Sequence, residues 1–229
     1  MITEREIYAR IKPLLESTTE GINWDFKKSL NKDHIPDIIK DVLAFSNSSY
    51  KGDSYIIVGV SEPQQNTKST TTRIALSTDD RRRLNTDANY IYTPDNWDVH
   101  GLSAGDIENM KQFSAALTEQ IACNMLISQP QCEFIPVRLG TTRWLYVIII
   151  KKVPGVFVSK KDILSGKDNK KVAVKQGVLY IRIADTTLGG RTDVASAAEH
   201  IRIWKQYIDW LEMHDNANKL SEEKQNDNT

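Results

Sequence analysis

The stretch EGINWDFK at residues 20–27 decides both the fold and the candidate chemistry, and its residues 22–27 have the composition of an extended strand. Successive side chains of a strand point to opposite faces. Asp25 and Lys27 therefore share one face, and Trp24 and Phe26 take the other. We expect polar chemistry on the first face and core packing on the second.

Two further acids accompany this strand: Glu20 precedes it, and Glu62 ends a later apolar strand. Two or three carboxylates that converge with an ammonium group suit a divalent cation in phosphodiester cleavage, because they neutralise the metal while the lysine offsets developing negative charge. The pattern favours a metal-dependent nuclease. The alternative for Asp25 and Lys27 is a surface ion pair on an edge strand, worth roughly 0–1 kcal/mol.

Length and composition fit one substantial core, since the chain has 229 residues, of which 40% are hydrophobic. Its 30 basic and 30 acidic residues cancel, so any polyanion site must be a local patch. Cys123 and Cys132 lack zinc-type spacing and are expected to be free thiols. The longest apolar run, residues 144–150, is too short to span a bilayer, so the expected location is cytoplasmic and no membrane contact is expected.

Hydrophobic periodicity predicts an α/β chain that begins in the order helix, strand, helix, strand. A single domain over residues 1–214 is expected, with a long polar insertion at about 63–105 and a disordered tail at 215–229. The predicted helices cover residues 4–15 (with Thr3 as N-cap), 35–46, 104–126 and 194–214, and the predicted strands cover 54–60, 132–138, 143–150 and 178–183.

Two aromatic groups leave alternatives open. Trp97 in the polar insertion could stack on unpaired bases or pin the insertion to the body of the protein. The last helix is expected to turn Ile201, Trp204, Ile208 and Leu211 inward. It carries more aromatic surface than one core face needs, so a partner contact or a homodimer through this helix is a further expectation.

Several motifs in order resemble the Schlafen AlbA-like domain family. The resemblance implies an α/β (α+β) fold, with a mixed central sheet and flanking helices, and contact with nucleic acid. In the animal Schlafen branch it implies a metal-dependent RNA-cleaving site with three acidic residues, which fall on Glu20, Asp25 and Glu62 here. We expect Mg²⁺ or Mn²⁺ as the metal, and Lys27 as a further catalytic residue because Asp25-Phe26-Lys27 matches the acidic-x-Lys half of the restriction-endonuclease-like motif. The motifs are TE at 19–20, WDFK at 24–27, DVLAFSN at 41–47, YIIVGVSE at 55–62 and LYIRIADTT at 179–187.

Basic residues provide candidate phosphate contacts on a locally positive surface. Arg182 is unusual because it lies within an apolar strand, and its alternative role is an internal salt bridge to one of the acids. We therefore expect a nucleic-acid-binding domain, with metal-dependent endonuclease activity on RNA or single-stranded DNA. A non-catalytic DNA- or RNA-binding module and a regulatory protein-interaction module are the alternatives. The candidate phosphate contacts are Lys28, Arg81, Arg82, Arg83, Lys151, Lys160 and Arg182.

Overall fold

A computed structural model describes residues 3–17, 20–61, 97–139, 142–165, 171–185 and 189–226. Its centre is a four-stranded sheet with the order β1-β2-β6-β5. Strand β1 runs parallel to β2, whereas the β2–β6 and β5–β6 pairs are antiparallel. The predicted α/β fold with a mixed central sheet is therefore confirmed. The strands span Trp24–Lys27 (β1), Ser54–Val58 (β2), Cys132–Leu139 (β5) and Arg143–Ile150 (β6).

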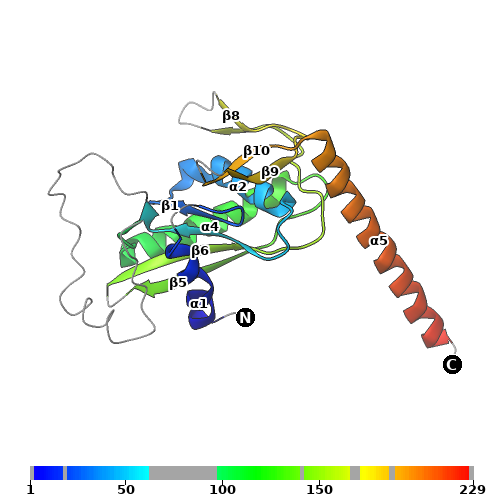
Figure 1. The fold of residues 1–229 in the computed structure, drawn as a ribbon, viewed down its shortest axis with the longest axis horizontal. Helices are drawn as coiled ribbons and strands as arrows, with labels where there is room; N and C mark the ends of the chain where they lie inside the picture. Colours follow the sequence, from blue (N-terminus) through cyan, green and yellow to red (C-terminus); the bar gives the residue numbers. More distant parts are fainter. Residues whose placement is uncertain are drawn as a thin grey trace.

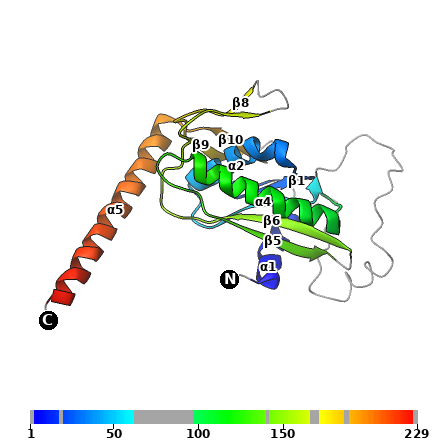
Figure 2. The ribbon, with the colours of Figure 1, turned by 180° about the vertical axis from the view of Figure 1, so that it is seen from behind.

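Helices cover both faces of this sheet (Figures 1 and 2). Helix α1 (Glu4–Leu15) packs on one face, and Thr3 starts it with a capping box to Glu6. Helices α2 (Ile35–Asn47) and α4 (Ala104–Asn124) pack on the other face. The predicted positions of these three helices are confirmed to within a few residues at their ends, because caps and apolar periodicity are local signals.

Strand β1 lies at one edge of the sheet, and its side chains alternate as the sequence predicts. Trp24 and Phe26 belong to the cluster around α1. Asp25 and Lys27 face α2, where Lys27 reaches Asp41. The parallel pairing with β2 thus delivers two charged side chains to the α2 side of the sheet.

A second layer of short strands packs over α2. Strands β9 (Tyr180–Asp185) and β10 (Gly189–Val194) form an antiparallel hairpin against this helix. The sequence predicts only the first of them, because β10 begins with two glycines and has no apolar alternation. Two further pairs of short strands and one 3-10 turn, η1, complete the described fold. They are β3 (Val60–Ser61) with β4 (Asp98–Val99), and β7 (Ile163–Ser165) with β8 (Lys171–Val174); η1 spans Lys32–His34.

Gly59 breaks the strand that the sequence predicts over residues 54–60. Its φ of +105° separates β2 from β3, and a Cβ there would lie 3.2 Å from the Cα of Gly101. The carbonyl of Gly59 accepts hydrogen bonds from the backbone N–H groups of His100 and Gly101. The chain therefore returns to the carboxyl ends of β1 and β2 immediately before α4 begins.

The last helix, α5 (Ala197–Asn226), differs from its prediction. It continues beyond residue 214, so the expected disordered tail is helical as far as Asn226. The predicted inward face is wrong: Ile201, Trp204, Ile208 and Leu211 are 39–69% exposed, whereas Ile203 is 3% exposed and packs with β9. The physical reason is that α5 projects away from the sheet, so only its beginning meets the body (Figure 1).

Within the described residues, no helix combines the length and the apolar character that crossing a lipid bilayer requires.

Candidate functional site

Five charged side chains from four elements or segments meet beside the edge strand. We call Glu20, Asp25, Lys27, Asp41 and Arg182 the charge cluster. Asp25 and Lys27 come from β1, Asp41 from α2 and Arg182 from β9, while Glu20 precedes β1. The cluster joins parts of the chain that are far apart in sequence.

Arg182 holds the two acids of the N-terminal segment. Its Nη2 lies 2.8 Å from Asp25 Oδ1 and 3.4 Å from Glu20 Oε2. The side chains of Arg182 and Asp25 are 4% and 5% exposed, and the guanidinium also lies 5.0 Å from the ring centroid of Phe45. The internal salt bridge left open for Arg182 is therefore observed, and the phosphate contact expected of this buried arginine stays a prediction.

Lys27 extends the cluster toward α2. It forms an ion pair with Asp25 and lies 3.5 Å from Asp41 Oδ2. Asp41 Oδ1 accepts a hydrogen bond of 2.9 Å from the hydroxyl of Thr192 on β10. Because Asp25 is buried, its contact with Lys27 is an interior pair rather than the surface pair that was the alternative.

The protonation of the acids follows from burial and from neighbouring charge. Burial, followed by repulsion from Asp25, raises the pKa of Glu20 to about 8, and the N–H of Phe26, which donates to Glu20 Oε1 at 2.8 Å, only partly offsets this. Burial also disfavours charge on Asp25, but Lys27 and Arg182 outweigh it and hold its pKa below the ordinary 3.8. Burial lowers the pKa of Lys27, but Asp41 and Asp25 raise it by more, so the net shift is upward. Burial raises the pKa of Asp41, and Lys27 opposes that rise. Near neutral pH, Glu20 is mostly protonated, and the Asp25 carboxylate faces two cations.

This donor set does not fit a resident divalent cation. Both oxygens of Asp25 already face cationic groups, and Glu20 retains a proton near neutral pH, whereas metal ligands must be deprotonated. In the part of the chain that the structure describes, no three acid, histidine or cysteine side chains are arranged to hold a metal. The third expected ligand, Glu62, lies outside the described residues.

The predicted phosphate contacts that fall within the described residues lie on separate parts of the protein. Lys28 is exposed at the carboxyl end of β1, whereas Lys151 follows β6 at the opposite end and pairs with Asp53 at 2.8 Å. Lys160 is exposed, and its backbone N–H bonds the carbonyl of Asn124 at the C-terminal end of α4. Arg81, Arg82 and Arg83 lie outside the described residues.

A cleft of about 350 Å³ opens beside the cluster at the carboxyl end of β1. Trp97 forms part of its wall: its ring centroid lies 4.5 Å from that of Phe26, and its indole N–H donates to the carbonyl of Ser17 at 2.6 Å. Trp97 is only 8% exposed and packs on the body of the protein. This is the second of the two alternatives given for Trp97, the first being stacking on unpaired bases. The cleft is lined by Glu20, Phe26, Lys27, Lys28, Val60, Ser61 and Trp97.

Sequence reasoning missed two members of this site. Asp41 is an acid within a helix whose neighbouring positions are mostly apolar, and that contrast could have marked it. Thr192 carries no comparable signal, since only the packing of β10 against α2 brings it to Asp41. Asn47, the last residue of α2, is 2% exposed and exchanges three hydrogen bonds with the backbones of Phe157 and Tyr180.

The charge cluster coincides with a region of family similarity. No curated protein matches the chain, but a family model described as Schlafen, AlbA_2 matches residues 20–188. The match includes all five members of the charge cluster and supports a nucleic-acid-associated function. Because this range is well over half of the 229 residues, the chain belongs to the Schlafen AlbA_2 family.

Proposed function

We propose that this protein binds nucleic acid at the carboxyl end of β1, with no metal needed for binding. The observation that carries the proposal is the placement of three lysines along one short segment. The Lys27 side chain is 32% exposed in the cleft, and Lys28 and Lys32 are exposed just beyond it. Such a row of ammonium groups suits the backbone of a nucleic acid.

The charge balance of the interior leaves these outer lysines available. Lys27 is already balanced by Asp25 and Asp41, so its contribution to a phosphate site is small. Neither Lys28 nor Lys32 pairs with an acid among the residues that the structure describes. The proposal therefore assigns the electrostatic attraction mainly to Lys28 and Lys32.

Binding to fluorescein-labelled single-stranded DNA and RNA, measured by anisotropy over a range of salt concentrations, tests this assignment. The double variant Lys28→Ala/Lys32→Ala should bind more weakly at low salt, and its salt slope should fall by about 1.4, since each phosphate contact to a single strand contributes about 0.7. Lys175→Ala/Lys205→Ala removes the same charge at two exposed positions outside the candidate phosphate contacts and is the matched control. Equal losses in both variants would place the binding surface elsewhere.

Metal-dependent cleavage of RNA or single-stranded DNA is the second candidate function. The observation in its favour is that Glu20 and Asp25 lie together beside Lys27; as arranged, a divalent cation would first have to displace the Arg182 guanidinium and the Glu20 proton. Incubation with Mn²⁺, Mg²⁺ or EDTA tests it, with Asp25→Asn and Lys205→Ala compared after circular dichroism has shown that both fold. Metal-dependent cleavage that only Asp25→Asn loses would establish the nuclease; binding without cleavage in any of these conditions would refute it.

We also propose that α5 pairs with α5 of a second copy of this chain. Its exposed apolar residues are spaced by three, four and three positions, which is the seam spacing of a coiled coil. Sedimentation over a range of protein concentrations should show self-association that Ile201→Glu/Ile208→Glu abolishes and Met213→Glu, an exposed position off the seam, retains. A wild-type protein that stays monomeric throughout would contradict the pairing. The seam residues are Ile201, Trp204, Ile208 and Leu211.

A further inference from the structure

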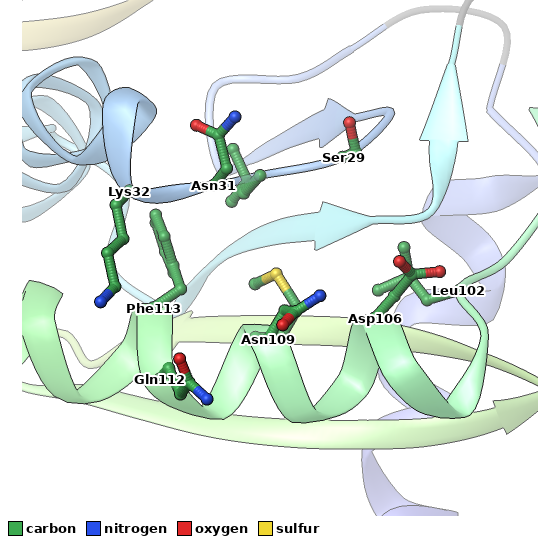
Figure 3. A pocket seen from close by; sticks show the side chains of 10 residues that line it. Ser29, Asn31, Lys32, Leu102, Asp106, Asn109, Gln112 and Phe113 are labelled. Atoms are coloured by element: carbon green, nitrogen blue, oxygen red, sulfur yellow. The ribbon is translucent and has the colours of Figure 1, made fainter.

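A second cavity lies on the other side of the same lysine segment. It has a volume of about 330 Å³, at the lower end of the range of small-ligand clefts, and separates residues 29–32 from the N-terminal half of α4 (Figure 3). We call it the amide pocket. It is lined by Ser29, Leu30, Asn31, Lys32, Leu102, Asp106, Asn109, Met110, Gln112 and Phe113.

The pocket combines an apolar floor with a mixed polar rim. Leu102, Met110 and Phe113 form the floor and are at most 5% exposed. Asn109 and Gln112 belong to the rim from α4, and neither side-chain amide has a hydrogen-bond partner within the described part of the chain. Each amide offers both donors and an acceptor.

The opposite side of the rim comes from the turn after β1. Asn31 uses its Oδ1 to accept from the N–H of Asp33 at 3.0 Å, which leaves its Nδ2 as a donor. Lys32 extends from this turn toward α4 (Figure 3). The rim thus has cationic and neutral donors as well as acceptors, so a purely anionic ligand such as phosphate would leave part of it unmatched.

Both walls of the pocket are fixed by hydrogen bonds. A ring nitrogen of His100 lies 3.1 Å from the carbonyl of Lys28, and Leu102 exchanges two backbone hydrogen bonds with Trp144 on β6. Asn31 and His34 are joined by a capping box that closes the turn. The pocket therefore exists before any ligand arrives, which lowers the ordering cost of binding.

We infer that the amide pocket receives one unpaired nucleobase of a single-stranded nucleic acid. A nucleobase has apolar faces and an edge of mixed donors and acceptors, which suits the floor and the rim, and side-chain amides are established partners of base edges. Lys28 lines the cleft beside the charge cluster and Ser29 lines the amide pocket, and the Cα atoms of these consecutive residues lie about 3.8 Å apart. A strand whose phosphates contact Lys28 and Lys32 can thus turn a neighbouring base into the pocket. The inference rests on the proposed nucleic-acid binding and adds the base as a determinant.

The test compares a short fluorescein-labelled single-stranded DNA with an abasic oligonucleotide of the same length, which keeps every phosphate but offers no base. We expect wild-type protein to bind the base-containing strand about tenfold more tightly, the effect of one good amide–base pair. Asn109→Ala/Gln112→Ala, which changes no charge, should lose this preference and keep the wild-type salt slope. Gln129→Ala removes an exposed amide beyond the far end of α4 and should keep both.

The outcomes separate the two proposals. If wild-type protein binds neither oligonucleotide at low salt, the proposed function fails and the pocket assignment fails with it. If binding is normal but Asn109→Ala/Gln112→Ala keeps the preference for bases, or wild type shows no preference, only the pocket assignment is overturned. Circular dichroism of both variants shows whether the fold is retained; because Asn109 and Gln112 are exposed, we expect no loss.

Discussion

Replacing Arg182 with methionine tests the role of the charge cluster in holding the two ends of the domain together. Methionine keeps the unbranched apolar stem of arginine as far as the position of Nε and lacks only the guanidinium beyond it, so the main loss is the cation that faces Asp25 and Glu20. Removing one partner of a buried ion pair typically costs about 3–5 kcal/mol, since the remaining charge stays buried. Lys27 still contacts Asp25, so we expect a loss near the lower end, about 3 kcal/mol.

Urea denaturation followed by tryptophan fluorescence measures this loss. With a denaturant slope of about 2 kcal/mol per molar, the midpoint should fall by roughly 1.5 M. The control is a double-mutant cycle with Asp25→Asn, in which Asp25→Asn/Arg182→Met should be more stable than the sum of the single losses predicts, by about 1–3 kcal/mol. A loss below about 1 kcal/mol for Arg182→Met, or strict additivity in the cycle, would refute the view that this pair anchors β9 to β1.

Three further predictions concern other parts of the fold. Asn47→Ala should lower the free energy of unfolding by about 3 kcal/mol in urea denaturation, because three buried backbone groups lose their hydrogen-bond partner. Asn47→Asp should also destabilise the protein, since an aspartate keeps only the hydrogen bond from the Phe157 N–H. Burial would raise the pKa of Asp53, but Lys151 and the backbone N–H of Lys152 hold it below 3.8. The contribution of Asp53 is therefore complete well above pH 3.8 and is lost as the pH falls through the lowered pKa of the folded state. Asp53→Asn should cost about 1 kcal/mol at pH 7, and a cost that stays the same as the pH is lowered through and below 3.8 would contradict this. Burial raises the pKa of the Cys132 thiol to about 12, whereas Cys123 is exposed. At pH 8 a disulfide reagent should therefore modify Cys123 rapidly and Cys132 mainly after unfolding. Rapid modification of both thiols in the folded protein would contradict this.

The parts of the fold that the sequence predicts well depend on local signals. The capping box at Thr3 and the apolar spacing of α1 and α2 lie within single segments, so no tertiary information is needed. Alternation in β1 likewise predicts which face Asp25 and Lys27 share. For α5, the same periodicity identifies an apolar stripe but not the body that covers it, and the helix extends away from the core.

The candidate site depends more on tertiary packing, and the sequence predicts less of it. Glu20 and Asp25 lie together as the sequence predicts, and Arg182 pairs with both of them. Its expected contact with phosphate stays a prediction. Asp41 and Thr192 enter only because α2 packs between the central sheet and β10. The roles of Glu62, Arg81, Arg82 and Arg83 stay predictions, since these residues lie outside the described part of the chain.

The location of α1 and β10 matters for anyone who prepares a shorter version of this protein. The range of family similarity, residues 20–188, starts after α1 and stops before β10. A fragment cut at those limits would expose the sheet surface that Ile7, Ile11 and Leu15 cover, and would deprive Asp41 of its Thr192 hydroxyl. The cooperative folding unit is therefore longer at both ends than the segment that sequence similarity delimits, and expression trials should retain at least residues 3–215.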